Sequence, residues 1–122
     1  MKFAKIAAVL LASFVVAVSH LHSNEKSNTA MKFLNLVNSG KYAEASQMAS
    51  PIMSNFLSED KIKGFWLPIE SRYGKPIGFG LPQPQKSTKD QIYLITIGFK
   101  VDSLNARIMV DSLDRISGLL FL

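Results

Sequence analysis

Cysteine is absent from the 122 residues of this sequence, and its absence excludes several classes of protein. Without thiols the chain has no disulfide bonds, no lipid attached through an N-terminal cysteine, no thiolate nucleophile and no cysteine-type zinc site. Tryptophan occurs once and histidine twice, at positions 20 and 22. Any domain beyond these positions therefore has no Ser-His or Asp-His catalytic pair. Because the chain has no disulfide bonds, the stability of such a domain must come from its core.

No apolar run reaches the roughly 20 residues that a helix needs to cross a bilayer. Ile6 to Val18 is uncharged and follows the basic residues Lys2 and Lys5, and the small residues Ala17-Val18-Ser19 come at its end. This pattern is typical of a secretory signal peptide cleaved after Ser19. The sequence therefore predicts a signal peptide over 1–19 and an exported protein, periplasmic or extracellular, with no stable membrane insertion after cleavage. If the segment is retained, the same domain is tethered to a membrane.

The basic excess is small once the predicted signal peptide is removed. The whole sequence has 14 basic and 9 acidic residues, for a net charge of +5, and the loss of Lys2 and Lys5 leaves 12 basic residues and a net charge of +3. The remaining basic residues are spread along the chain and often sit near an acid, whereas nucleic-acid binders concentrate them on one face. We therefore expect no nucleic-acid partner and no polybasic membrane patch.

Residues 20–28 are polar and are predicted to form a flexible leader, which leaves 29–122 as one domain. The first helix is indicated by apolar residues at i, i+3, i+4 and i+7, with Ser27 or Asn28 as N-cap and Gly40 as the stop. A second, short helix is expected from Tyr42 to Ala49, before Pro51. The apolar face of the first helix consists of Ala30, Phe33, Leu34 and Val37.

The third helix has the clearest start signal in the sequence. Ser58 is a suitable N-cap, acidic residues follow in the first turn, and Leu57 is placed to pack against Ile62. Its apolar face consists of Ile62, Phe65, Trp66, Ile69 and Tyr73, and Gly74 ends it. Because an interior proline lacks the amide hydrogen and crowds the carbonyl four residues back, Pro68 predicts a kink or break between Gly64 and Pro68.

After Gly74 the periodicity changes from helical to alternating, which predicts a sheet. A first strand is expected over 76–81 and a polar excursion over 82–90. A central strand over 91–101 has one wholly apolar face, and strands over 104–111 and 115–122 follow after turns. The central strand's apolar face consists of Tyr93, Ile95, Ile97, Phe99 and Val101. Helices first and antiparallel strands second predict an α+β fold, with the helices on one face of a curved sheet.

Three segments carry a family resemblance, which covers Thr29 to Leu122. They are Gly40-Lys41-Tyr42-Ala43-Glu44-Ala45, Trp66 seven residues before Tyr73-Gly74, and Arg115-Ile116-Ser117-Gly118-Leu119-Leu120-Phe121. Together they resemble a small exported bacterial domain of unknown function in the nuclear-transport-factor-like, cystatin-like α+β roll superfamily, related to domains found before serine or α/β hydrolases. Pro68 and the proline-rich segment 82–84 depart from the pattern. The resemblance implies a cone between sheet and helices that holds an active site or a small ligand in some relatives.

Few residues suit chemistry inside such a cone. The candidate set for a small apolar ligand consists of Trp66, Tyr73, Tyr93, Phe99 and Arg107. An aromatic stripe at helical spacing is also typical of a core, and Arg107 with Asp111 also fits a surface ion pair. The preferred interpretation is a non-enzymatic binding or assembly module with no catalytic residues and no cofactor. The alternative is a small-molecule enzyme with a polar site in the cone.

Two further interpretations concern the predicted terminus and the sheet. Cleavage after Ser19 exposes His20-Leu21-His22, and a free amine with histidine at the third position suits square-planar copper(II) or nickel(II). The outer sheet face is expected to be apolar, which usually marks a partner surface. We therefore expect a homodimer through the sheet face, with an envelope or secreted protein as a second possible partner. That face is predicted to present Ile92, Leu94, Ile108, Val110, Leu120 and Leu122.

Overall fold

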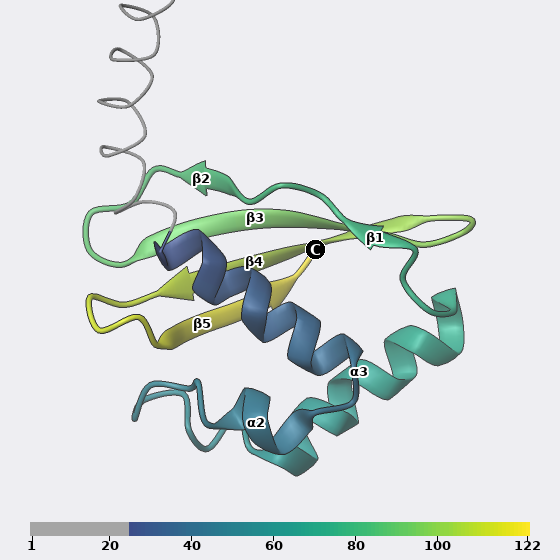
Figure 1. The fold of residues 1–122 in the computed structure, drawn as a ribbon, viewed down its shortest axis with the longest axis horizontal. Helices are drawn as coiled ribbons and strands as arrows, with labels where there is room; N and C mark the ends of the chain where they lie inside the picture. The colour runs from purple at the N-terminus through teal and green to yellow at the C-terminus, as the bar shows by residue number, and fades with distance from the viewer. Residues whose placement is uncertain (1–24) are drawn as a thin grey trace, which may run out of the picture.

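A computed structural model describes residues 25–122, in which three helices precede a five-stranded antiparallel sheet (Figure 1). This order confirms the α+β class. The predicted signal peptide and its cleavage site lie outside the described residues. The elements are an N-terminal helix (residues 25–38), α2 (Tyr42–Ser46), α3 (Glu59–Tyr73), β1 (Gly78–Phe79), β2 (Gln83–Gln85), β3 (Gln91–Gly98), β4 (Ser103–Val110) and β5 (Ile116–Phe121).

The sheet is built around β3, as predicted for a central strand. β3 pairs with β4 over its whole length, β4 pairs with β5, and the short strands β1 and β2 pair in turn with the other side of β3. Strand β2 falls in the segment expected to be a polar excursion. Its three residues are all exposed, and Pro84 is tolerated there because an edge strand needs only one of its two sides for pairing.

The helices cover one face of the sheet, and Figure 1 shows the N-terminal helix crossing diagonally in front of β4 and β5. All four predicted core positions of that helix are at most 1% exposed. Between helices and sheet lies one apolar core. Its largest members are Trp66, Tyr93, Phe33, Leu34, Leu57, Ile62, Ile95, Ile97, Ile108 and Ile116.

The N-terminal helix includes residues 25–28, which the sequence assigned to the leader. Its first described turn is fixed by Lys26, whose Nζ donates to the Asp111 carbonyl oxygen at 2.8 Å and lies 2.8 Å from Asp114 Oδ1. The predicted N-cap at Ser27 or Asn28 is therefore wrong, because a contact 88 positions along the chain supports an earlier turn. The stop at Gly40 is confirmed, with a φ of 76° that favours glycine.

Helix α2 ends earlier than expected, because the following residues join the sheet. Ala49 forms a parallel bridge with Ile116, the Ser50 N–H donates to the Ile116 carbonyl at 2.8 Å, and the Ile116 N–H donates to the Met48 carbonyl at 2.8 Å. Residues 48–50 thus cover the beginning of the outer edge of β5, and the chain leaves this edge at Pro51.

Helix α3 begins and ends where the sequence predicts. The Ser58 hydroxyl accepts from the Lys61 N–H at 3.4 Å, Leu57 and Ile62 are both buried, and Gly74 ends the helix with a φ of 85°. Of the kink or break predicted between Gly64 and Pro68, the break is wrong, because the helix is continuous through Pro68. Gly64 and Pro68 are both exposed, so water can hydrate the carbonyl that proline leaves without a partner.

The two faces of the sheet differ from the prediction at four positions. Ile92 lies on the outer face as predicted but is only 6% exposed, so it is not part of an exposed surface. Ile108 and Val110 are fully buried on the helix side, where Ile108 stands opposite Tyr93, and Val101 is 92% exposed in the turn between β3 and β4. The register follows from that turn, in which the Phe99 N–H donates to the Asp102 carbonyl. The opposite assignment would bury the Arg107 guanidinium, at a large desolvation cost.

Candidate functional site

The four aromatic candidates for a ligand lie on the helix side of the sheet. Trp66, Tyr93 and Phe99 are 0%, 1% and 4% exposed, and Tyr73 is half-buried. The Tyr73 and Phe99 rings have centroids 5.2 Å apart, and the Trp66 ring lies 6.3 Å from that of Phe121. These side chains pack into the common core, where they contribute mainly through burial.

Arg107 is separated from the other four candidates by the sheet itself. It stands in β4 opposite Leu94 and Leu120, on the face away from the helices, and its side chain is exposed. Asp111, its expected partner in an ion pair, contacts Arg115 instead, at 2.9 Å between Oδ2 and Nε. The structure therefore brings together the four aromatic candidates and leaves Arg107 outside.

Two ionisable groups near this core have displaced pKa values. Burial raises the pKa of the Tyr93 hydroxyl above its usual 10.0, and the Asp114 carboxylate raises it further. Burial would also raise the pKa of Asp111, but hydrogen bonds from the Arg115 and Leu113 amides and the Arg115 side chain outweigh it and lower that pKa. At neutral pH, Tyr93 is thus protonated and Asp111 is a carboxylate held by its neighbours, and neither is set up as a general base.

The predicted metal-binding residues His20 and His22 lie outside the described residues. Within residues 25–122, no group of three or more His, Cys, Asp or Glu side chains is arranged to hold a metal ion. In the same range no helix is long and apolar enough to cross a membrane.

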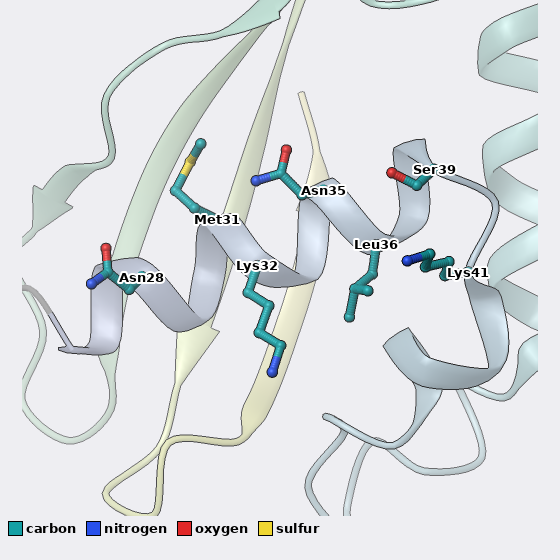
Figure 2. A pocket seen from close by; sticks show the side chains of 7 residues that line it. All are labelled: Asn28, Met31, Lys32, Asn35, Leu36, Ser39 and Lys41. Atoms are coloured by element: carbon teal, nitrogen blue, oxygen red, sulfur yellow. The ribbon is translucent and has the colours of Figure 1, made fainter.

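A hollow of about 470 Å³ lies along the outward side of the N-terminal helix (Figure 2). Lys32 and Leu36 project to one side of the helix, and Met31 and Asn35 project to the other. The lining residues diverge in this way because they lie on either side of the helix, where Met31 and Leu36 also pack against the core. They include no carboxylate, histidine or aromatic ring, so they offer no catalytic pair. The lining consists of Asn28, Met31, Lys32, Asn35, Leu36, Ser39 and Lys41.

A second hollow, of about 310 Å³, is polar and lies beside the turn between β4 and β5. Its two carboxylates are already occupied, since Ser117 Oγ donates to Asp90 Oδ2 at 2.7 Å and Asp111 accepts from Arg115 and Leu113. Ser50 Oγ is buried without a hydrogen-bond partner in the described part of the chain. These contacts hold the turn in place.

A third hollow, of about 230 Å³, is apolar and adjoins β5. Phe56 is 67% exposed at its rim, and the Phe65 and Phe121 rings within its lining are 5.5 Å apart. Sequence reasoning missed this site because its residues come from three distant segments. The one indication of this site in the sequence was Phe56. It is an aromatic residue between the second and third predicted helices, and it belongs to the apolar face of neither helix. The lining consists of Met53, Phe56, Leu57, Phe65, Leu119, Leu120 and Phe121.

The outer face of the sheet is the second apolar surface. No helix or strand of residues 25–122 covers it, because all three helices pack on the other side. The strand register places two rows of side chains across it. In one row Ile92 on β3 stands beside Met109 on β4. In the other row Leu94 on β3 stands beside Arg107 on β4, and Arg107 stands beside Leu120 on β5. Leu120 and Leu122 are 50% and 61% exposed. Thr96 Oγ1 donates to Asn105 Oδ1 at 3.0 Å in the next row.

Comparison with known proteins gives no relative: no family model, no curated protein and no solved structure matches the chain. The functional assignment therefore depends on the two apolar surfaces, the hollow beside β5 and the outer face of the sheet.

Proposed function

We propose that this protein is an exported, non-enzymatic assembly module that forms a homodimer through the outer face of its sheet. The observation that carries the proposal is the uncovered apolar stripe across β3, β4 and β5, in which Leu94, Leu120 and Leu122 are half-buried or exposed. An apolar surface of this kind usually marks a contact with another protein, since its exposure to water is unfavourable.

A second copy is the occupant that best fits this face. Its polar members include Gln83, Thr96 and Asn105, which each carry a donor and an acceptor, so the same groups of a two-fold-related copy can satisfy them. Arg107 is the one charged residue among those paired across β3, β4 and β5 on this face. A single charge does not indicate a strongly charged partner.

The packing beneath the sheet supports assembly rather than small-ligand binding in the cone. Trp66 and Tyr93 fill the space between helices and sheet and are at most 1% exposed. The order of elements and the single covered face support membership of the cystatin-like α+β roll in the nuclear-transport-factor-like superfamily, which we propose as the family of this domain.

Sedimentation of the purified protein across a range of concentrations tests the dimer. We expect the wild type to reach twice the mass of one chain, and the substitution Leu94→Lys to weaken the dimer at least about tenfold, or about 1.4 kcal/mol, because it places a charge within the contact. Leu94 is half-buried on the exposed face, and the lysine stem can cover the same neighbours, so the fold should persist.

Leu113→Lys is the matched control for this experiment. Leu113 is 68% exposed in the turn between β4 and β5, away from the proposed contact. The control should dimerise like the wild type. A wild type that remains monomeric at every concentration would refute self-association through this face.

Export is tested by the mass of the protein recovered from the cell envelope and medium. We expect a chain that begins at His20, because signal peptidase recognises small residues such as Ala17 and Ser19. The measurement is intact-mass spectrometry, with a signal-blocking Ala17→Arg variant as control. Recovery of the full-length chain in the cytosol would contradict export, and any other first residue would remove the proposed metal-binding terminus of His20 and His22.

A further inference from the structure

The two edges of the sheet are protected to different degrees. At one edge, β2 is three residues long, contains Pro84, and is followed by Lys86 and Lys89. These are the features by which proteins prevent an edge strand from pairing with another chain. At the other edge, β5 and the residue that follows it contain no charged side chain and no proline. The edge formed by β5 is therefore open to strand pairing.

The main-chain groups of β5 that point away from β4 can be identified from the register. Leu122 and Asn105 exchange both main-chain hydrogen bonds, at 2.8 and 3.0 Å. Because such pairs alternate along an antiparallel ladder, Leu120 also faces β4, and the N–H and C=O groups of Leu119 and Phe121 point outward. No strand among residues 25–122 pairs with these outward groups.

The apolar hollow adjoins these same two residues. Leu119 and Phe121 form one side, while Met53, Phe56 and Leu57 belong to the segment that leads into α3. None of its seven lining residues is charged. An occupant must therefore offer main-chain hydrogen bonds toward β5 and uncharged apolar side chains toward the hollow.

The molecule already uses this edge for strand pairing once. Residues 48–50 bond to Ile116 through two main-chain hydrogen bonds of 2.8 Å, and they leave the edge at Pro51. The unpaired part of β5 begins just beyond this bridge. An incoming segment beside Leu119 and Phe121 would continue a pairing that the chain itself starts.

We infer that β5 and the adjoining hollow bind an extended, uncharged apolar segment of another polypeptide, which adds to the sheet as a further strand. A single segment fits this place better than the edge of a second folded copy, because residues of the segment before α3 line the hollow opposite β5. This site shares Leu120 with the outer sheet face proposed for dimerisation, but its other lining residues and its occupant differ.

Fluorescence anisotropy with a defined probe tests the inference on the full-length protein. The probe is a fluorescein-labelled short peptide of alternating leucine and threonine, and its matched control carries N-methyl groups on the amides of one edge. We expect saturable binding of the probe and at least about tenfold weaker binding of the methylated peptide, because methylation removes the donors that pair with β5. Slower hydrogen exchange at the Leu119 and Phe121 amides should accompany binding.

A pair of variants locates the site. Phe56→Ala should weaken probe binding about tenfold, whereas Leu113→Ala, which truncates an equally exposed apolar residue in another turn, should leave it unchanged. The Leu94→Lys variant should bind like the wild type, so failure of the dimer does not affect this test. Equal binding of the methylated peptide, equal effects of the two alanine variants, or no saturation would each overturn the inference.

Discussion

Replacement of Trp66 by alanine is expected to lower the free energy of unfolding by about 3–5 kcal/mol. The indole is fully buried and packs at 6.3 Å from the Phe121 ring. Its removal leaves a cavity between α3 and β5. A domain of this size has about 5–15 kcal/mol of stability in total, so urea unfolding should show a much lower midpoint.

Two further substitutions serve as controls for this measurement. Leu67→Ala, in the same helix but 46% exposed, should change the stability by less than about 1 kcal/mol. Trp66→Phe keeps a ring in the core and removes an indole N–H that is buried without a partner in the described part of the chain, so its loss should be well below that of alanine. If Trp66→Ala proved nearly neutral, the space below the sheet would be hollow, and a ligand pocket in the cone would regain support.

The second large effect is expected from Asp111→Asn, at about 2 kcal/mol near neutral pH. The carboxylate accepts from the Leu113 N–H at 3.0 Å and from the Arg115 N–H and Nε at 2.9 Å each. An amide in its place has one oxygen and presents an NH₂ group to one of these donors. The turn between β4 and β5 should lose most of its support.

The pH dependence of this effect follows from the lowered pKa of Asp111. A carboxyl whose pKa is lower when folded than when unfolded adds stability above its unfolded value, near 3.8, and that stability is lost as the pH falls through the folded pKa. The difference between wild type and Asp111→Asn should therefore be full at neutral pH and shrink as the pH falls below 3.8. Asp102→Asn is the control, because Asp102 accepts a local bond from the Ser103 N–H and is exposed. A difference that persists in acid would contradict this account.

The sequence predicts the features that depend on near neighbours. The core positions of the N-terminal helix, the cap at Ser58 and the stops at Gly40 and Gly74 all follow from residues within one or two turns. The same holds for the alternation of β3. Such signals need no knowledge of the rest of the chain, so the α+β order is readable from them.

The features that the sequence did not predict depend on distant contacts. The faces of Ile108 and Val110 are set by the register across the turn after β3, and the helical state of residues 25–28 is supported by a contact of Lys26 with Asp114. The bridge of Ala49 to Ile116 is of the same kind. Alternation within one strand shows which residues share a face, but the direction of that face depends on the partner strand.

The sequence predicts the candidate sites only in part. Aromatic residues at helical and strand spacing were correctly placed on one side of the sheet, but spacing does not tell a packed core from a pocket wall, and Arg107 lies on the other side. The apolar hollow beside β5 joins residues near 53, 65 and 120. No local pattern connects these positions, since the fold alone brings them together.

The attachment of the N-terminal helix to the last turn has a consequence for how the protein acquires its structure. Lys26 contacts Asp114 across 88 positions, and residues 48–50 pair with the first residue of β5. Contacts of such long sequence separation form late, because the entropy of closing the chain must be overcome first. During synthesis the N-terminal helix and residues 48–50 therefore lack their final partners until β5 has emerged from the ribosome. The domain then completes its fold only after the last strand has been synthesised.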